Sequence, residues 1–362
     1  MLINHCNKTH HLIVPLMLVA ILWFAIYANY WYFLLLLIPI IYLLNNHLTL
    51  KQILVYALIV IVLVIIGVCC HNINLWQHLG SGLDRLLHFS VRDHVQNYVS
   101  NSYDKTTSSF INLILFNIKD YPANTTYYHM KDLSVVYLIV VSGFHISILK
   151  RGVTFILRRS PRWANVVNIL LITFYCYLLN FAISVTRVLL MFLVGLIFSK
   201  KLKNRIDVLA IAGLISVSLA PTCVFNVGFC MSYLCTLVII LIYRLNIHNV
   251  LLEKLFISIA ATLVSLPFIV YMQQQISLWA IFNSFALSYV FAFVFIYFLM
   301  TFWIIWIGVI QHALVVGINF IINASWTSNT VIPISNWPPL ISCSYFIVFY
   351  LGIIMLQSYK NT

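Results

Sequence analysis

The chain has 362 residues, of which 63% are hydrophobic and only 7% are charged. Because about a quarter of the residues in a soluble domain are usually charged, this composition excludes an ordinary water-soluble protein. The net charge of +13 would suggest nucleic-acid binding in a soluble protein, but in a membrane protein its meaning depends on where the cations lie.

Apolar stretches recur along the whole chain. A helix that crosses a bilayer needs about 20 apolar residues, and hydrocarbon offers the backbone no hydrogen-bond partner outside its own helix. No stretch alternates as a barrel strand would. We therefore expect an all-α fold, a polytopic transmembrane helical bundle of about 10–12 spans. The candidate spans are 12–28, 30–44, 52–70, 133–149, 164–181, 183–199, 207–221, 224–243, 255–271, 278–299, 301–322 and 341–357.

The lysines and arginines fall unevenly on the two sides of these spans. With the N-terminus inside, fourteen of the twenty lie on one side and five on the other, while Arg187 lies within a span. Since cytoplasmic loops are enriched in lysine and arginine, both termini are predicted to face the cytoplasm. The protein is thus expected to be a multi-pass protein of the cell membrane, in contact with the lipid bilayer, and most of its positive charge reflects topology.

One sizeable segment, 71–132, is predicted to lie outside, after a group of N-terminal helices in 1–70. Apolar residues at helical spacing predict an amphipathic helix over 83–99, which either lies on the outer membrane surface or packs on the bundle. A second apolar stretch, Phe110–Ile118, is too short to span and is interfacial or re-entrant.

Several kinds of chemistry have no basis in the sequence. There is no glycine-rich phosphate loop ending in GK[ST] and no HExxH motif, and the seven carboxylates are scattered over both sides of the membrane. The eight cysteines form no CxxC pair, and the histidines of 71–132 lack metal-ligand spacing beside carboxylates. We expect no enzymatic activity, no cofactor and no metal.

Polar groups inside apolar spans are candidate functional residues because burying them in the membrane is costly. Ser142 and His145 are three residues apart and share a helix face, while Gly143 permits close helix approach. His145 either lines a polar path or forms a hydrogen bond across a helix interface. These two interpretations are equally consistent with the sequence.

The other candidates lie in three later spans. Arg187, just after Ser184, would cost about 2.5 kcal/mol or more in lipid, and its distance from the outer end of its span favours a polar interior over snorkelling. Phe229 and Ser232 lie near the outer start of another span, where a lone serine commonly holds helices together. Asn283 lies near the start of the span 278–299.

These residues fall into ordered motifs that resemble the signatures of the ComEC-type competence proteins. The resemblance covers roughly residues 75–300, and four matches in the family's order are more specific than any one of them. Tyr137–Ile146 resembles "HLLAISGLHV", Ser184-Val185-Thr186-Arg187 with Met191 resembles "SVxRAxxM", Pro221–Ser232 resembles "P…GFQLS", and Leu266-Pro267 and Asn283 match the later "tlP" and "N" positions. The chain departs from the family at Tyr137, where His is usual, at Cys230 for Gln, and at Val188 for Ala.

The resemblance implies an inner-membrane channel that passes single-stranded DNA into the cell during natural transformation. It places a competence-type channel domain at 133–322, followed by an external loop, a last helix and a tail over 323–362. The implied path is lined by Ser142, His145, Arg187 and Ser232. Full-length members also carry an oligonucleotide-binding fold, for which 71–132 is too short, and a metallo-β-lactamase-like nuclease domain, which we expect to be absent. The implied partners are single-stranded DNA, a cytoplasmic ATPase and a separate nuclease.

Two other functions stay open at this point. A small-solute permease would be expected to show inverted repeats, and no clear repeat relates the two halves. A scaffold subunit of an envelope complex would use its polar residues only to hold helices together. The sequence also leaves open whether the protein is a monomer or a homodimer.

Overall fold

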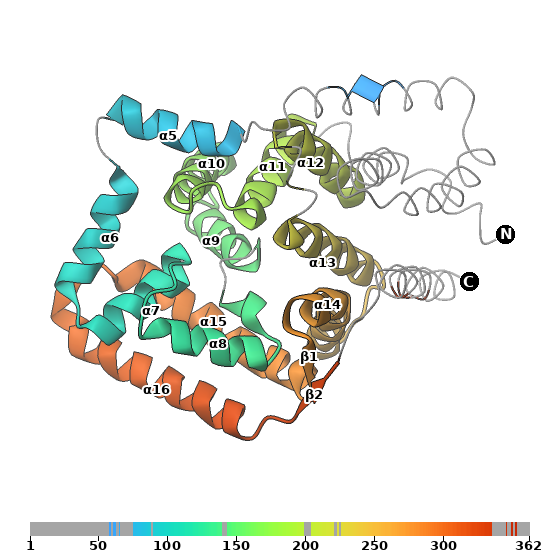
Figure 1. Ribbon diagram of the computed structural model, residues 1–362. Coiled ribbons are helices and arrows are strands. Elements are labelled where there is room, and N and C mark those ends of the chain that lie inside the picture. Colours follow the sequence, from blue (N-terminus) through green and yellow to red (C-terminus); the bar gives the residue numbers. More distant parts are fainter. Residues whose placement is uncertain are drawn as a thin grey trace.

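The computed structural model describes residues 75–87, 90–139, 143–198, 204–220 and 226–334, together with a few single residues outside these ranges. The predicted spans 12–28 and 30–44 lie outside this part, and 52–70 and 341–357 lie almost entirely outside it. The described part is helical apart from one short strand pair, which confirms the all-α prediction (Figure 1).

Most predicted spans in the described part correspond to single helices. The helices are α10 (Pro161–Leu178), α11 (Ile183–Ile197), α12 (Arg205–Leu219), α13 (Val227–Tyr243), α14 (Val250–Gln273), α15 (Ala280–Thr301) and α16 (Gly308–Thr327). Among the described residues, α14, α15 and the stretch Ile305–Thr327 are long and apolar enough to cross a membrane, and α11 and α13 are shorter apolar helices. This supports a membrane protein, while the count of 10–12 spans stays a prediction.

The predicted span 133–149 is wrong in its bounds. It contains a short 3-10 helix, η3 (Val136–Leu138), and the following helix α9 (Gly143–Ile156) begins ten residues later than predicted and continues past the predicted end. Ser134 has a positive φ of 59°, so the backbone leaves helical geometry at the start of this apolar run. Apolar composition alone does not reveal such a break. Ser142 lies outside the described residues.

The described residues of the segment 71–132 form the helices α5 (Leu75–Leu87), α6 (Val91–Ser102), α7 (Lys105–Phe116) and α8 (Ala123–Asp132). The single helix predicted over 83–99 is therefore wrong. Ser90 has extended backbone angles and its hydroxyl accepts a hydrogen bond from the Asp93 amide at 3.3 Å, so it caps a new helix. As Figure 1 shows, α5 and α6 run in clearly different directions.

Helix α7 is a core element of the described fold. Every residue from 107 to 116 is buried, and α7 packs against α6, α8, α15 and α16. Asp104 caps its N-terminus by accepting a hydrogen bond from the Thr107 amide at 3.1 Å. Residues 110–116 of the stretch predicted as Phe110–Ile118 thus belong to a buried helix.

The segment 71–132 also reaches the connection between α15 and α16. The Tyr98 hydroxyl donates to the Trp303 carbonyl at 3.1 Å, and the Tyr103 hydroxyl donates to the Phe302 carbonyl at 2.8 Å. The charge count predicts that this connection lies inside and 71–132 outside, whereas the two hydrogen bonds bring the two segments together. The sidedness of 71–132 and the re-entrant alternative for Phe110–Ile118 stay predictions.

Asp132, the last residue of α8, connects three distant parts of the chain. Its carboxylate accepts hydrogen bonds from Gln275 Nε2 and Trp326 Nε1, both at 3.0 Å. Gln275 begins strand β1 (Gln275–Ser277), which pairs antiparallel with β2 (Val331–Pro333). One carboxylate therefore holds the end of α8 against this strand pair and the end of α16.

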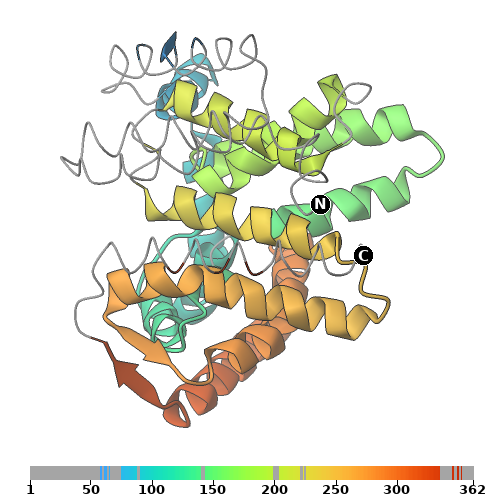
Figure 2. The ribbon, with the colours of Figure 1, turned by 90° about the vertical axis from the view of Figure 1, so that its right-hand side faces the viewer.

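The buried side chains form two clusters. The larger is built around α7, α10, α11, α15 and α16, and the smaller around α12, α13 and α14. Figure 2 shows α13 and α14 side by side, in agreement with their extensive contacts. Helix α11 contributes buried residues to the larger cluster, while its Ile183 and Met191 pack on the smaller. Helix α11 thus lies at the seam between the two clusters.

A core position of α7 tests its packing. We expect Leu113→Ala, at a fully buried side chain, to destabilise the protein by about 2–5 kcal/mol, because it leaves a cavity. The matched control is Leu251→Ala, at a side chain that is 67% exposed. Thermal unfolding of the detergent-solubilised protein should show a lower midpoint for the first variant only. Equal midpoints would place α7 outside the packed core.

Candidate functional site at Arg187

Arg187 is a buried cation in an apolar helix. It lies in the second turn of α11, its side chain is 6% exposed, and Val185, Leu189 and Leu190 around it are also buried. Helix α11 packs against α9, α10, α12 and α13. The guanidinium is therefore surrounded by other helices, as the sequence predicted from its distance to the end of the span.

The guanidinium binds one face of α13. Its Nη1 donates to the carbonyl oxygen of Ser232 and to the hydroxyl oxygen of Thr236, which lies one turn later. The Thr236 hydroxyl in turn donates to the Ser232 carbonyl at 2.8 Å, so its lone pairs remain directed at the arginine. The Tyr233 ring centre lies 5.8 Å from the guanidinium carbon, within range of a cation–π interaction.

Gly143 completes the contact from the start of α9. A Cβ at this position would lie 2.4 Å from Nη2 of Arg187 and 3.0 Å from a methyl group of Val188. Only a residue without a side chain allows α9 to approach the guanidinium in this way. Residues from three of the predicted motifs, Gly143, Arg187 and Ser232, thus meet at one point.

Neutral groups are the partners of this cation. The ion pairs among the described residues are Arg92 with Asp93 and His312 with Asp104, and neither includes Arg187. Nε of Arg187 is buried and has no hydrogen-bond partner among the residues that the structure describes. A buried cation with only neutral acceptors is poorly compensated, since an isolated charge loses far more hydration than a few hydrogen bonds return. The site is therefore electrostatically suited to an anion.

An aromatic pair and a hydroxyl extend the site toward α12. Phe229 packs on Tyr233 with ring centres 4.5 Å apart, and the Tyr233 hydroxyl is hydrogen-bonded to Ser216 at 2.9 Å. Phe229 therefore reaches the site indirectly, by supporting the ring that faces Arg187. Ser232 contributes its backbone carbonyl to Arg187, in the place where the sequence suggested its side chain.

The remaining predicted site residues lie elsewhere. Ser184 is half-buried one turn before Arg187 in α11. His145 is buried and its ring lies against Phe295 of α15, with ring centres 4.6 Å apart, so it lies at the interface of α9 and α15. Asn283 is half-buried near the start of α15 and is not among the contacts of Arg187.

A second polar cluster was missed by the sequence reasoning. The Tyr137 hydroxyl is hydrogen-bonded to Ser284 and, at 3.3 Å, to Thr262, and Ser284 is bonded to Ser258 at 3.1 Å. These hydroxyls connect η3, α14 and α15. Ser258 and Thr262 are four residues apart, so a search for polar pairs on one helix face would have found them. The same spacing relates Ser232 to Thr236.

The family match includes the residues of the Arg187 site and those of the hydroxyl cluster around Tyr137. The family model described as "Competence protein" matches residues 114–359, which is more than half of the chain and includes every motif residue. The chain belongs to the competence protein family. The match confirms the resemblance that the ordered motifs predicted, and the family is associated with DNA uptake in transformation.

Individual relatives are distant. The chain is 26% identical over 183 residues to the uncharacterized protein MG316 of Mycoplasma genitalium, and 27% identical over 183 residues to its Mycoplasma pneumoniae homolog. Each match covers 50% of this chain and 49% of the relative. The ComE operon protein 3 of Bacillus subtilis is 23% identical over 197 residues, which are 52% of this chain and 25% of that protein. No solved structure matches.

The contact between Gly143 and Arg187 leaves no room for a side chain at position 143. We expect Gly143→Ala to lower the midpoint of thermal unfolding, because the added methyl group overlaps Nη2 of Arg187 and must displace the guanidinium from α13. Gly152→Ala in the same helix is the matched control, since a Cβ there meets nothing within 4 Å. The measurement is thermal unfolding of the detergent-solubilised protein. If both variants lower the midpoint equally, the contact with Arg187 is not the cause.

Proposed function

We propose that this protein is an inner-membrane channel component through which single-stranded DNA enters the cell during natural transformation. The observation that carries the proposal is the buried Arg187, which lies where three family motifs meet and whose partners are neutral groups. DNA is a polyanion, and its phosphates are the groups that cationic side chains bind without regard to sequence.

The surroundings of Arg187 suit a strand that must move. A cation in a low-dielectric site attracts phosphates more strongly than the same cation in water. The Ser232 carbonyl and the Thr236 hydroxyl hold the guanidinium in place between passing phosphates, so that it need not collapse onto a permanent carboxylate partner. Conduction requires binding that is favourable enough to admit each group and weak enough to release it, and one cation meets this condition better than a cluster would.

The proposal includes two partners. The sequence has no nucleotide-binding phosphate loop, so the energy for movement comes from a separate motor, a cytoplasmic ATPase. The seven scattered carboxylates offer no paired metal ligands for hydrolysis of a strand, so a separate nuclease supplies the single strand. The chain spans about half the length of the mycoplasma relatives, and the activities of whole relatives enter here only as part of the proposal.

Substitution of Arg187 tests the channel. We expect Arg187→Ala to lower nuclease-protected, labelled DNA inside cells at least tenfold while surface-bound DNA is unchanged, because a charge-assisted contact is worth about 1.5–3 kcal/mol. Arg187→Lys should retain part of the uptake because it keeps the positive charge. Arg151→Ala, at an exposed arginine of α9, is the matched control.

The outcomes separate the competing functions. Unchanged uptake at equal protein abundance would remove Arg187 from the mechanism. A loss of protein from the membrane in Arg187→Ala, with normal uptake per remaining molecule, would support the scaffold subunit. Normal uptake after deletion of the whole gene would bring the permease forward.

A further inference from the structure

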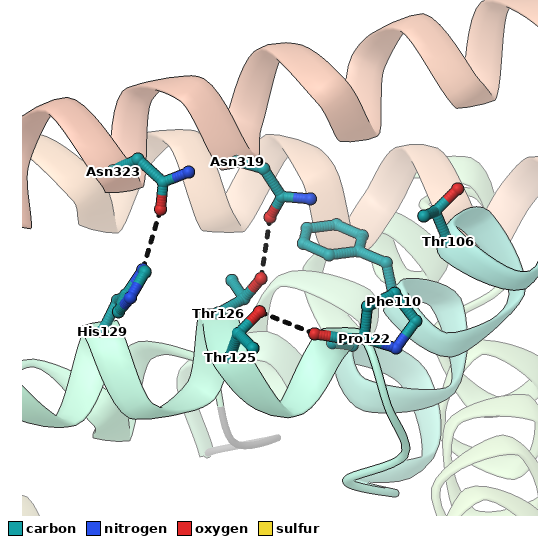
Figure 3. Close-up of a pocket in the computed structure, with 9 residues that line it drawn as sticks. Thr106, Phe110, Pro122, Thr125, Thr126, His129, Asn319 and Asn323 are labelled. Carbon is teal, nitrogen blue, oxygen red and sulfur yellow. Dashed lines mark hydrogen bonds between the residues drawn. The ribbon is translucent and has the colours of Figure 1, made fainter.

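A polar cavity of about 160 Å³ lies between α7, α8 and α16 and shares no lining residue with the Arg187 site. Figure 3 shows side chains of all three helices around it. Its lining residues are Thr106, Phe110, Pro122, Ala123, Thr125, Thr126, His129, Asn319 and Asn323. Apart from His129, none of these side chains can carry a charge, so the cavity is suited to a neutral ligand.

Two asparagine amides are held in fixed orientations at this cavity. The Thr126 hydroxyl donates to Oδ1 of Asn319 at 2.8 Å, and Nδ1 of His129 is hydrogen-bonded to Oδ1 of Asn323 at 2.8 Å. Asn319 and Asn323 are four residues apart and share one face of α16. Because both oxygens are occupied, the two NH₂ groups are turned away from α8, and Figure 3 shows them directed the same way along α16.

The threonines of the cavity complement these donors. The hydroxyl of Thr106 donates to Asp104, that of Thr125 to the Pro122 carbonyl at 2.7 Å, and that of Thr126 to Asn319. With their protons committed, the three hydroxyls offer only lone pairs. The cavity thus presents amide donors and hydroxyl acceptors together, the combination that matches the mixed donor and acceptor edge of a nucleobase.

An aromatic platform adjoins the cavity. The Trp326 ring stacks on His129 with ring centres 4.4 Å apart and planes 17° apart, and Trp326 Nε1 donates to Asp132 at 3.0 Å. The indole is therefore fixed both by a ring contact and by a hydrogen bond, yet Trp326 is 40% exposed. A fixed, partly exposed indole is a favourable surface for stacking of a base.

We infer that this cavity and the Trp326 platform bind an unpaired nucleobase. The inference rests on the proposed function and adds to it a means of distinguishing single strands from duplex. In a duplex the edge of each base is paired and its faces are stacked, so only an unpaired base can both enter the cavity and lie on Trp326. Arg187 would contact the backbone of the same strand, whereas the Asn319 and Asn323 amides contact its bases.

Binding to an oligonucleotide with and without bases tests this directly. The full chain is placed in lipid nanodiscs, and fluorescence anisotropy is measured with a single strand of about twelve nucleotides and with an abasic strand of equal length. We expect the strand with bases to bind at least tenfold more tightly than the abasic strand, since hydrogen bonds and stacking together exceed about 1.4 kcal/mol. In the double variant Asn319→Leu and Asn323→Leu this difference should fall below about twofold.

The matched control is Asn97→Leu, at an exposed asparagine of α6, which should keep the full difference. A second measurement uses only the unchanged protein, so it does not depend on the folding of a variant. A strand carrying 5-iodouracil is crosslinked by light, and we expect the label on peptides that contain Trp326 or His129.

Equal affinity for the two strands, an unchanged difference in the double variant, or crosslinks confined to other peptides would overturn the inference. In those cases Trp326 serves only as an interfacial anchor of α16, as tryptophans at membrane surfaces commonly do. Base-independent binding that depends on Arg187 would overturn this inference alone. Absence of binding to any DNA would overturn both this inference and the proposed function.

Discussion

The structure depends on the accommodation of one cation inside an apolar bundle. Arg187 can be buried in α11 only because α13 presents a carbonyl and a hydroxyl to it and α9 begins with a glycine where any side chain would collide. These requirements fix the approach of α9, α11 and α13 to one another. They also explain why the motif residues lie far apart in the sequence yet meet at one place in the fold.

The helices after residue 160 could be predicted well from the sequence, because each is an apolar run bounded by polar or charged residues. The described region before it, residues 75–159, could not. The span predicted over 133–149 contains a break at Ser134, and the helix predicted over 83–99 ends and restarts at Ser90. In both cases the apolar spacing continues through the break, so periodicity gives no sign of it. The burial of α7 could not be predicted either, since a short apolar run does not indicate which other helices will pack against it.

The candidate site was predicted in part. Arg187 could be predicted as a site residue because it is a charged residue within an apolar span. Gly143 and Ser232 were found through the motifs. Thr236 and Tyr233 were missed because neither hydroxyl stands out in a helix of otherwise apolar residues. Ser232 was found for the wrong reason, since its carbonyl and not its side chain contacts Arg187. Sequence patterns identify residues, but which atom of a residue is used depends on how two helices face each other.

The hydrogen bonds of Asp132 have a consequence for synthesis of the chain. Its carboxylate is bonded to Gln275, 143 residues later, and to Trp326, 194 residues later. While the ribosome is still making the intervening helices, this carboxylate has neither partner, and α8 cannot take its final position against α16. Segments so distant in sequence meet slowly because loop closure must precede their contacts. The end of α8 can therefore reach its final hydrogen bonds only after α16 has been synthesised, 194 residues later.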